Sequence, residues 1–117
     1  MRNHNKLRAF ELADEIALLT YKLTKDFPKE ETYGLSAQMR RAAVSIPSNI
    51  VEGCARESLG EYLRFLEIAF SSLRELSYQF SLAQRLEYVG SIDSKYKQKL
   101  VETEKVIAAL LRSLRKT

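Results

Sequence analysis

The residues of this sequence best suited to chemistry are its arginines and lysines, whose cations bind phosphate. There are 19 Lys and Arg against 15 Asp and Glu, a formal net charge of +4. Side chains that neutralise backbone phosphates gain free energy from the counterions they release. A mild basic excess permits nucleic-acid contact without requiring it, since many ordinary soluble proteins share this balance. The arrangement of the helices that carry the cations therefore decides whether they form a site.

Residue types that catalyse reactions or hold metals are scarce. The single histidine, His4, precedes the first predicted helix, so a di-iron site built from Glu and Glu-x-x-His motifs is excluded. The single cysteine, Cys54, lies on the apolar side of a predicted helix, where a small buried residue is the ordinary interpretation. There is no phosphate-cradling glycine loop and no G-x-S-x-G motif. We expect no catalytic residue, no metal site, no cofactor and no enzymatic activity.

Four stretches have apolar residues at spacings of three and four, which predicts four amphipathic helices. We expect the helices over residues 8–27, 35–54, 58–87 and 92–115. The short connections between them favour antiparallel neighbours. The predicted fold is an all-α, up-down-up-down antiparallel four-helix bundle that forms one domain over residues 1–117.

Helix boundaries are marked by proline, glycine and capping residues. Pro28 should end the first helix and Gly90 the third. Ser58 with Glu61 three residues later is a capping box for the third helix. The cap of the fourth helix is expected at Ser91 or Asp93.

A polar stripe runs along the second predicted helix and surrounds a proline. Pro47 removes an amide donor from the helix interior, so we expect a kink or a break that costs about 3 kcal/mol. The stripe could face solvent, or it could form a hydrogen-bonded network between helices or subunits. Serine and asparagine are poor helix formers at free surface positions, which favours the network. Its candidate members are Arg41, Ser45, Pro47, Asn49 and Glu52.

The predicted topology gathers basic residues at the end of the bundle where the first helix starts and the last helix ends. These residues are Arg2, Lys6, Arg8, Arg56, Arg112, Arg115 and Lys116. One interpretation is a phosphate-binding surface. The other is that the C-terminal cations complement the dipole of the last helix, and the absence of aromatic residues among them favours this slightly for a monomer.

Extra apolar residues lie outside the main stripes of the last two helices and suggest a subunit interface. They are Leu59, Leu63, Phe70, Val101, Val106 and Leu111. A chain with one cysteine forms no internal disulfide, and no stretch resembles a signal peptide or an apolar membrane span. We expect a cytoplasmic protein without membrane association.

Two segments, ELADEIALLTYKLTKDFPKEETYGLSAQMRRAAVSIPSNIVEG and RESLGEYLRFLEIA, resemble a known family almost end to end. This is the family of small bacterial four-helix bundle proteins that includes those encoded by intervening sequences in 23S rRNA genes. Its most specific part is RRAAVSIPSNI, and the departures at Val51, Cys54 and Ser71 are small. The resemblance implies a left-handed bundle that assembles as a cyclic homopentamer, and it brings no catalytic residues.

The sequence is also similar to the accessory subunit of diversity-generating retroelements, a basic pentameric bundle that binds a reverse transcriptase and nucleic acid. We therefore expect a non-enzymatic oligomeric adaptor that contacts RNA or an RNA-associated protein such as a reverse transcriptase. The expected phosphate contacts are Arg8, Arg56, Arg112, Arg115 and Lys116, with Arg40 and Arg41 as further candidates. The alternative is a structural protein–protein interaction module without nucleic-acid binding.

Overall fold

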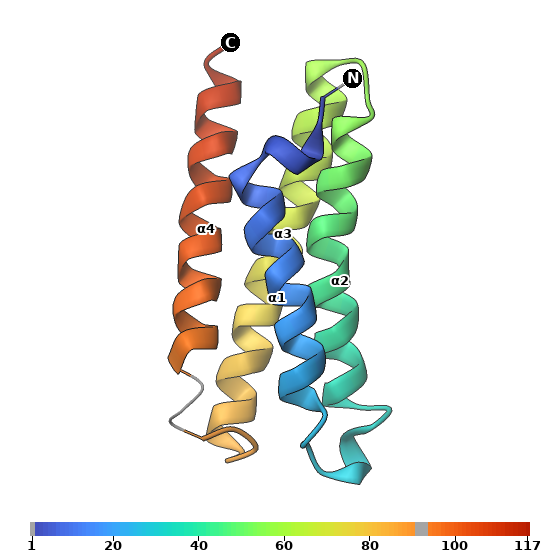
Figure 1. The fold of residues 1–117 in the computed structure, drawn as a ribbon, viewed down its shortest axis with the longest axis vertical. Helices are drawn as coiled ribbons and strands as arrows, with labels where there is room; N and C mark the ends of the chain where they lie inside the picture. The colour runs from blue at the N-terminus through green and yellow to red at the C-terminus, as the bar shows by residue number, and fades with distance from the viewer. Residues whose placement is uncertain (1, 91–93) are drawn as a thin grey trace.

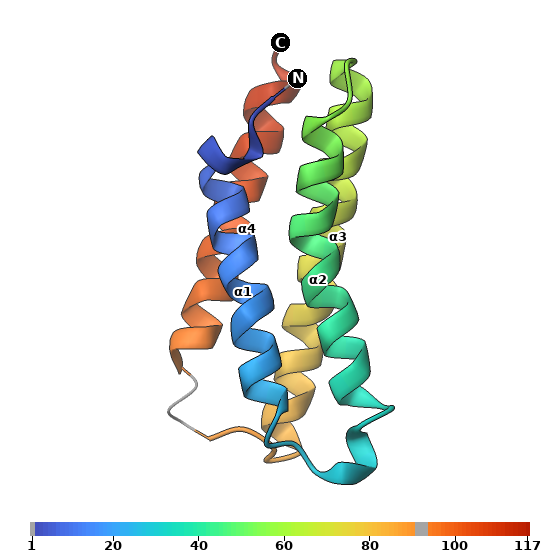
Figure 2. The same cartoon turned by 45° about the vertical axis from the view of Figure 1, so that its right-hand side comes forward.

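All four stretches with periodic apolar residues form helices in the computed structural model, which describes residues 2–90 and 94–117. The helices are α1 (Arg8–Thr24), α2 (Leu35–Cys54), α3 (Leu59–Arg85) and α4 (Ser94–Arg115), with 3-10 turns η1 (His4–Lys6) and η2 (Lys29–Glu31). Successive helices run antiparallel, and α4 packs back against α1 (Figures 1 and 2). The described residues form no strand. The predicted all-α, up-down-up-down bundle is confirmed.

An apolar core fills the space between the helices and receives one buried stripe from each. Leu12, which lies off the main stripe of α1, is fully buried, because α1 packs against both α2 and α4 and so buries a wide face. One position differs from the sequence prediction. Leu111, expected at a subunit interface, is only 5% exposed within one chain and belongs to the core. No helix in the described part of the chain is long and apolar enough to cross a membrane.

Pro47 lies inside α2 without interrupting it. The helix is continuous from Leu35 to Cys54, and Pro47 is buried. Of the two expected outcomes, a kink or a break, the break is therefore wrong. The Asn49 amide donates to the Ser45 carbonyl at 2.8 Å, in the turn that contains the proline. The carbonyl that loses its backbone donor is that of Ala43, four residues before Pro47, and burial of the proline ring helps to offset this loss.

The two ends of α3 are set by different local structures. At the start of α3, Ser58 Oγ accepts from the Glu61 amide at 3.1 Å, as the capping-box motif predicts. At its end, α3 stops at Arg85 rather than at Gly90. The Tyr88 amide donates to the Ala83 carbonyl at 2.9 Å. This closes a Schellman turn.

The residue at the turning point of that Schellman motif is Glu87, with a φ of 62°. Glycine is the usual residue in this left-handed conformation, and other side chains cost about 1 kcal/mol there. Glu87 thus takes the place of the glycine that usually ends a helix, and the expectation that Gly90 ends α3 is wrong. The first helix also ends early, at Thr24 rather than at residue 27. Ser91 and Asp93, the expected caps of α4, lie outside the described residues.

Glu31 joins two loops at the end of the bundle opposite the start of α1. Its Oε1 accepts from the Leu35 amide at 2.9 Å, which caps α2. Its Oε2 accepts from the Tyr88 hydroxyl at 2.8 Å. These two hydrogen bonds favour the ionised carboxylate and lower the pKa of Glu31 below its ordinary value of 4.5.

Helices α2 and α3 approach each other closely at Gly53. A Cβ atom at this position would lie 2.8 Å from Phe65 Cβ and 3.3 Å from Tyr62 Cδ1. Both distances are shorter than ordinary van der Waals contacts, so only a residue without a side chain permits this packing. The glycine weakens helix propensity near the end of α2 and in return allows the two helices to meet.

We expect Gly53→Ala to destabilise the fold by about 1–3 kcal/mol, because the added methyl group must push α3 away. Urea denaturation followed by circular dichroism measures the change. The matched control is Gly60→Ala, because a Cβ at Gly60 meets nothing within 4 Å. Alanine there should stabilise α3 by about 0.5–1 kcal/mol. Equal effects of the two substitutions would contradict the packing argument.

We expect Glu31→Gln to change the pH dependence of stability. Because the folded pKa of Glu31 is lowered, its carboxylate stabilises the fold above the unfolded pKa, and this contribution is lost as pH falls through the folded value. The free-energy difference between wild type and Glu31→Gln should therefore shrink below about pH 5, as thermal denaturation across pH can show. The matched control is Glu30→Gln, which removes a neighbouring exposed carboxylate and leaves both hydrogen bonds of Glu31 in place.

Candidate nucleic-acid interface

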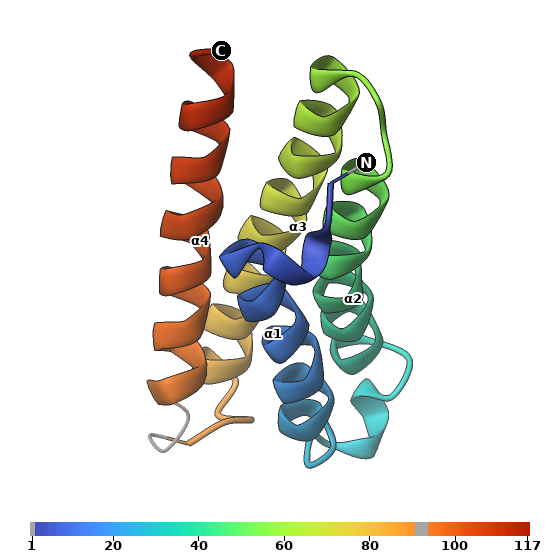
Figure 3. The ribbon, with the colours of Figure 1, turned by 45° about the horizontal axis from the view of Figure 1, so that its top comes forward.

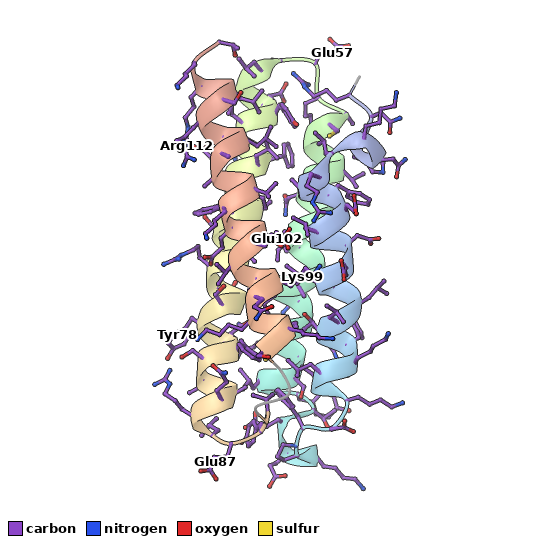
Figure 4. All side chains as sticks on the ribbon, turned by 60° about the vertical axis from the view of Figure 1, so that its left-hand side comes forward. Glu57, Tyr78, Glu87, Lys99, Glu102 and Arg112 are labelled. Atoms are coloured by element: carbon purple, nitrogen blue, oxygen red, sulfur yellow. The ribbon has the colours of Figure 1, made fainter. Side chains whose placement is uncertain are left out.

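The basic end of the bundle is defined here as Arg2, Arg56, Arg112, Arg115 and Lys116. It is built by the residues before η1, by the turn between α2 and α3, and by the last turns of α4 (Figure 3). Arg112 projects outward from α4 toward this end, where Glu57 also lies, whereas Glu87 lies at the opposite end (Figure 4). Four of the predicted phosphate contacts are thus brought to one end: Arg56, Arg112, Arg115 and Lys116.

Arg2 ties the N-terminal segment to the end of α2. Its amide donates to the Cys54 carbonyl at 3.0 Å, and its guanidinium donates to the Arg56 carbonyl at 2.9 Å. These bonds satisfy carbonyl groups that a helix leaves unpaired at its C-terminus. The guanidinium also lies 4.1 Å from the ring centroid of Tyr62, within cation–π range. One cation of the basic end is therefore fixed on an aromatic ring.

Cys54 and Tyr62 form the buried floor beneath Arg2. Burial raises the pKa of Tyr62 to about 12, and it also raises the pKa of the Cys54 thiol. Cys54 is 1% exposed, so the thiol is protonated and shielded at neutral pH. A thiol in that state is a poor nucleophile.

Arg56 is supported in a similar way. Its guanidinium lies 4.8 Å from the ring centroid of Phe65, which α3 presents beside the end of α2. Arg112 and Lys116 are exposed, and neither side chain forms a hydrogen bond or an ion pair in the described part of the chain. These cations are therefore available to bind an anion from solution.

Two predicted phosphate contacts are instead paired with carboxylates. Arg115 lies 2.6 Å from a Glu67 oxygen. Arg8 lies 2.8 Å from Glu102 and 3.0 Å from Glu11, and the hydrogen bond to Glu102 raises the pKa of Arg8. Exposed ion pairs of this kind contribute at most about 1 kcal/mol, so an incoming phosphate can compete for them.

Arg8 also lies away from the basic end. Its partner Glu102 sits near the middle of α4, ten residues before Arg112 (Figure 4). At 1.5 Å per residue, this corresponds to about 15 Å along the helix. The sequence placed Arg8 at the end because it is the first residue of α1, but α1 begins well below the last turn of α4.

Arg40 and Arg41 form a separate cationic region in the first half of α2. Arg40 Nε donates to Thr24 Oγ1 at 2.8 Å, and its guanidinium lies 4.7 Å from the ring centroid of Tyr21. Arg41 is exposed and has no hydrogen bond or ion pair among the described residues. Arg41 and Arg56 are fifteen positions apart, which corresponds to about 22 Å along the α2 direction.

The polar stripe of α2 divides into two groups. Ser45 Oγ and Ser72 Oγ form a hydrogen bond of 2.8 Å that joins α2 to α3, and the Asn49 amide donates to Ser45 Oγ at 3.0 Å. Arg41 and Glu52 are exposed and take no part in this network within the described residues. Of the candidate members, Ser45 and Asn49 thus form hydrogen bonds beside the buried Pro47.

Sequence reasoning missed the aromatic rings beneath the cations and the carboxylates beside them. Tyr62 lies sixty residues from Arg2, and Phe65 is separated from Arg56 by a turn, so no local spacing reveals either pair. The expectation that aromatic residues are absent from the basic end is wrong. No group of three or more His, Cys, Asp and Glu side chains in the described residues could hold a metal ion.

Comparisons with known proteins agree with this architecture. A crystal structure at 1.70 Å of a protein of unknown function from the S23 ribosomal protein family of Bacteroides thetaiotaomicron VPI-5482 has a similar fold, with a TM-score of 0.79 and 22% identity. The match covers 88% of this chain and 97% of that one. The comparison with curated proteins gave no match. The family model of the 23S rRNA-intervening sequence protein matches residues 5–110, so the chain belongs to that family.

Proposed function

We propose that this protein is a non-enzymatic, oligomeric adaptor that contacts RNA, or an RNA-associated protein such as a reverse transcriptase, through its basic end. The proposal rests mainly on one observation. Two guanidinium groups, those of Arg2 and Arg56, are supported on the rings of Tyr62 and Phe65, at the same end of the bundle as the exposed Arg112 and Lys116. Cations grouped in this way suit a run of phosphates.

The supported guanidinium groups favour binding because their positions are already restricted. A free arginine loses side-chain entropy when it binds an anion, whereas one held on a ring has lost part of it during folding. The family name supports RNA as the polyanion, since it refers to a sequence within 23S rRNA. The resemblance to the accessory subunit of diversity-generating retroelements supports the same class of partner.

We also propose that the adaptor is a cytoplasmic homopentamer. The family resemblance supports this assembly, and a ring would repeat the basic end and strengthen weak contacts through multivalency. Of the expected interface residues, Leu59, Leu63 and Phe70 are half-buried against the core of their own chain and keep part of their surface for a neighbour. Val101 on α4 is 42% exposed.

The second candidate is a structural module that binds a partner protein and no nucleic acid. The observation that favours it is the pairing of Arg8 and Arg115 with carboxylates, which leaves fewer unpaired cations than the sequence suggests. In that case the remaining charges serve solubility, and Leu59, Leu63 or Phe70 become buried against the partner.

The charge-reversal variant Arg112→Glu/Lys116→Glu tests RNA binding. These residues are preferable to Arg115, because reversal at Arg115 would place a carboxylate beside Glu67. We expect weaker binding of single-stranded RNA and a salt dependence reduced by about 0.7 in log–log slope per lost contact. Fluorescence anisotropy over a series of salt concentrations measures both.

The matched control is Lys95→Glu/Lys97→Glu, which makes the same change in net charge with two exposed lysines in the first turn of α4, at the opposite end. Its affinity and slope should stay near those of wild type. Equal losses in the two variants would show that only net charge matters. No loss in either would remove the basic end as the RNA contact.

Light scattering tests the assembly. We expect a mass near five times the 13.5 kDa of one chain, and a further increase with RNA at low salt that reverses at moderate salt. The increase should reverse because salt weakens phosphate contacts and leaves apolar subunit contacts in place. A monomer indifferent to RNA would overturn both the pentamer and the adaptor. An oligomer that ignores RNA and binds protein would support the second candidate.

A further inference from the structure

A groove lies between the end of α1, the residues before α2 and the first half of α2, which run side by side in Figures 1 and 2. Its volume is about 560 Å³. The residues that matter for its chemistry are Tyr21, Tyr33, Ala37, Arg40, Arg41 and Val44. They provide two aromatic rings, two guanidinium groups and a small apolar floor.

The aromatic rings of the groove are unusually open. Tyr33 is 95% exposed, so its ring has almost no packing role in the fold. Tyr21 is 48% exposed and carries the Arg40 guanidinium 4.7 Å from its ring centroid. Arg40 is held there by its bonds to Thr24 Oγ1 at 2.8 Å and to the Tyr21 carbonyl at 3.4 Å. The groove therefore combines the exposed ring of Tyr33 with the Tyr21 ring, on which the Arg40 guanidinium is held in place.

The charge of the groove is entirely positive. No carboxylate lines it, whereas Arg41 is exposed and unpaired in the described part of the chain. Glu31, from the preceding turn, is engaged with the Leu35 amide and the Tyr88 hydroxyl. Glu75 does not line this groove; it lines a neighbouring pocket to which Arg41 also contributes. The groove is therefore complementary to an anion that also has a flat face.

We infer that this groove holds an unpaired nucleotide of single-stranded RNA, with the base against Tyr33 and the phosphate on Arg41. Exposed aromatic rings stack bases of any sequence, and arginine adds charge and cation–π attraction. A duplex would not fit, because its base faces are stacked on one another. A protein helix is less suited, because Val44 is the one exposed aliphatic side chain in the lining.

The inference rests on the proposed RNA binding and adds a second, chemically different contact to it. The basic end lies about 22 Å away along α2 and binds phosphate alone. The groove would select strands whose bases are free. Together the two regions would distinguish single-stranded RNA from a duplex of equal charge.

The test compares two labelled probes of equal length by fluorescence anisotropy: oligouridylate, and the same sugar-phosphate chain without bases. Tyr33→Ala should weaken binding of oligouridylate about fivefold or more, since stacking of one base is lost. Binding of the abasic probe should not change. Tyr33→Phe should keep the affinity of wild type, because it keeps the ring. Because Tyr33 is exposed, none of these changes threatens folding.

The matched control is Tyr78→Ala, at a tyrosine on α3 that is 61% exposed and lies outside the groove. It should leave both probes unaffected. Salt-sensitive RNA binding that Tyr33→Ala does not alter would overturn the groove and leave the proposed function standing. Absence of RNA binding by the wild-type protein would overturn both. If Tyr33→Ala changed the mass of the assembly but not the preference for bases, the groove would be a contact between chains instead.

Discussion

The contact between α2 and α3 at Gly53 determines the positions of much else in this molecule. Because Gly53 has no side chain, Phe65 and Tyr62 of α3 reach the end of α2. Arg56, three residues beyond Gly53, then lies over Phe65, and Arg2 lies over Tyr62. The basic end therefore depends on an apolar contact beneath it, and the positions of its cations follow from helix packing.

Local sequence signals predicted the bundle well because most of its fold is encoded locally. Apolar periodicity identified all four helices, and Ser58 with Glu61 identified the start of α3. The errors occurred where tertiary packing overrides a local rule. Pro47 stays within α2, and Glu87 takes a conformation usually reserved for glycine.

The candidate interface was less predictable, because its geometry is set by residues far apart in the chain. The predicted topology was enough to place four cations at one end of the bundle: Arg56, Arg112, Arg115 and Lys116. It could not reveal that Arg115 is paired with Glu67, nor that Arg8 lies beside Glu102. The charge of Arg41 makes it a candidate from sequence alone, whereas no local signal distinguishes Tyr33. Its role as an open ring becomes visible only when its exposure and its neighbours in the groove are known.

The four seams between helices differ in chemistry. The α2–α3 seam is the most extensive and combines apolar packing with the Ser45–Ser72 hydrogen bond. The α1–α4 seam is the smallest of the four. It is bordered by the ion pairs of Arg8 with Glu102 and of Glu15 with Lys99, around a buried hydrogen bond of 2.6 Å between Thr20 and Tyr96.

Ion pairs at the surface weaken with ionic strength, whereas apolar packing does not. The bundle therefore has a preferred direction of opening. Helices α2 and α3 share the largest contact, and the separation of α4 from α1 breaks the smallest one. Transient opening on this side would expose the inner face of α1 to solvent while the α2–α3 pair, and the aromatic supports of Arg2 and Arg56, remain intact.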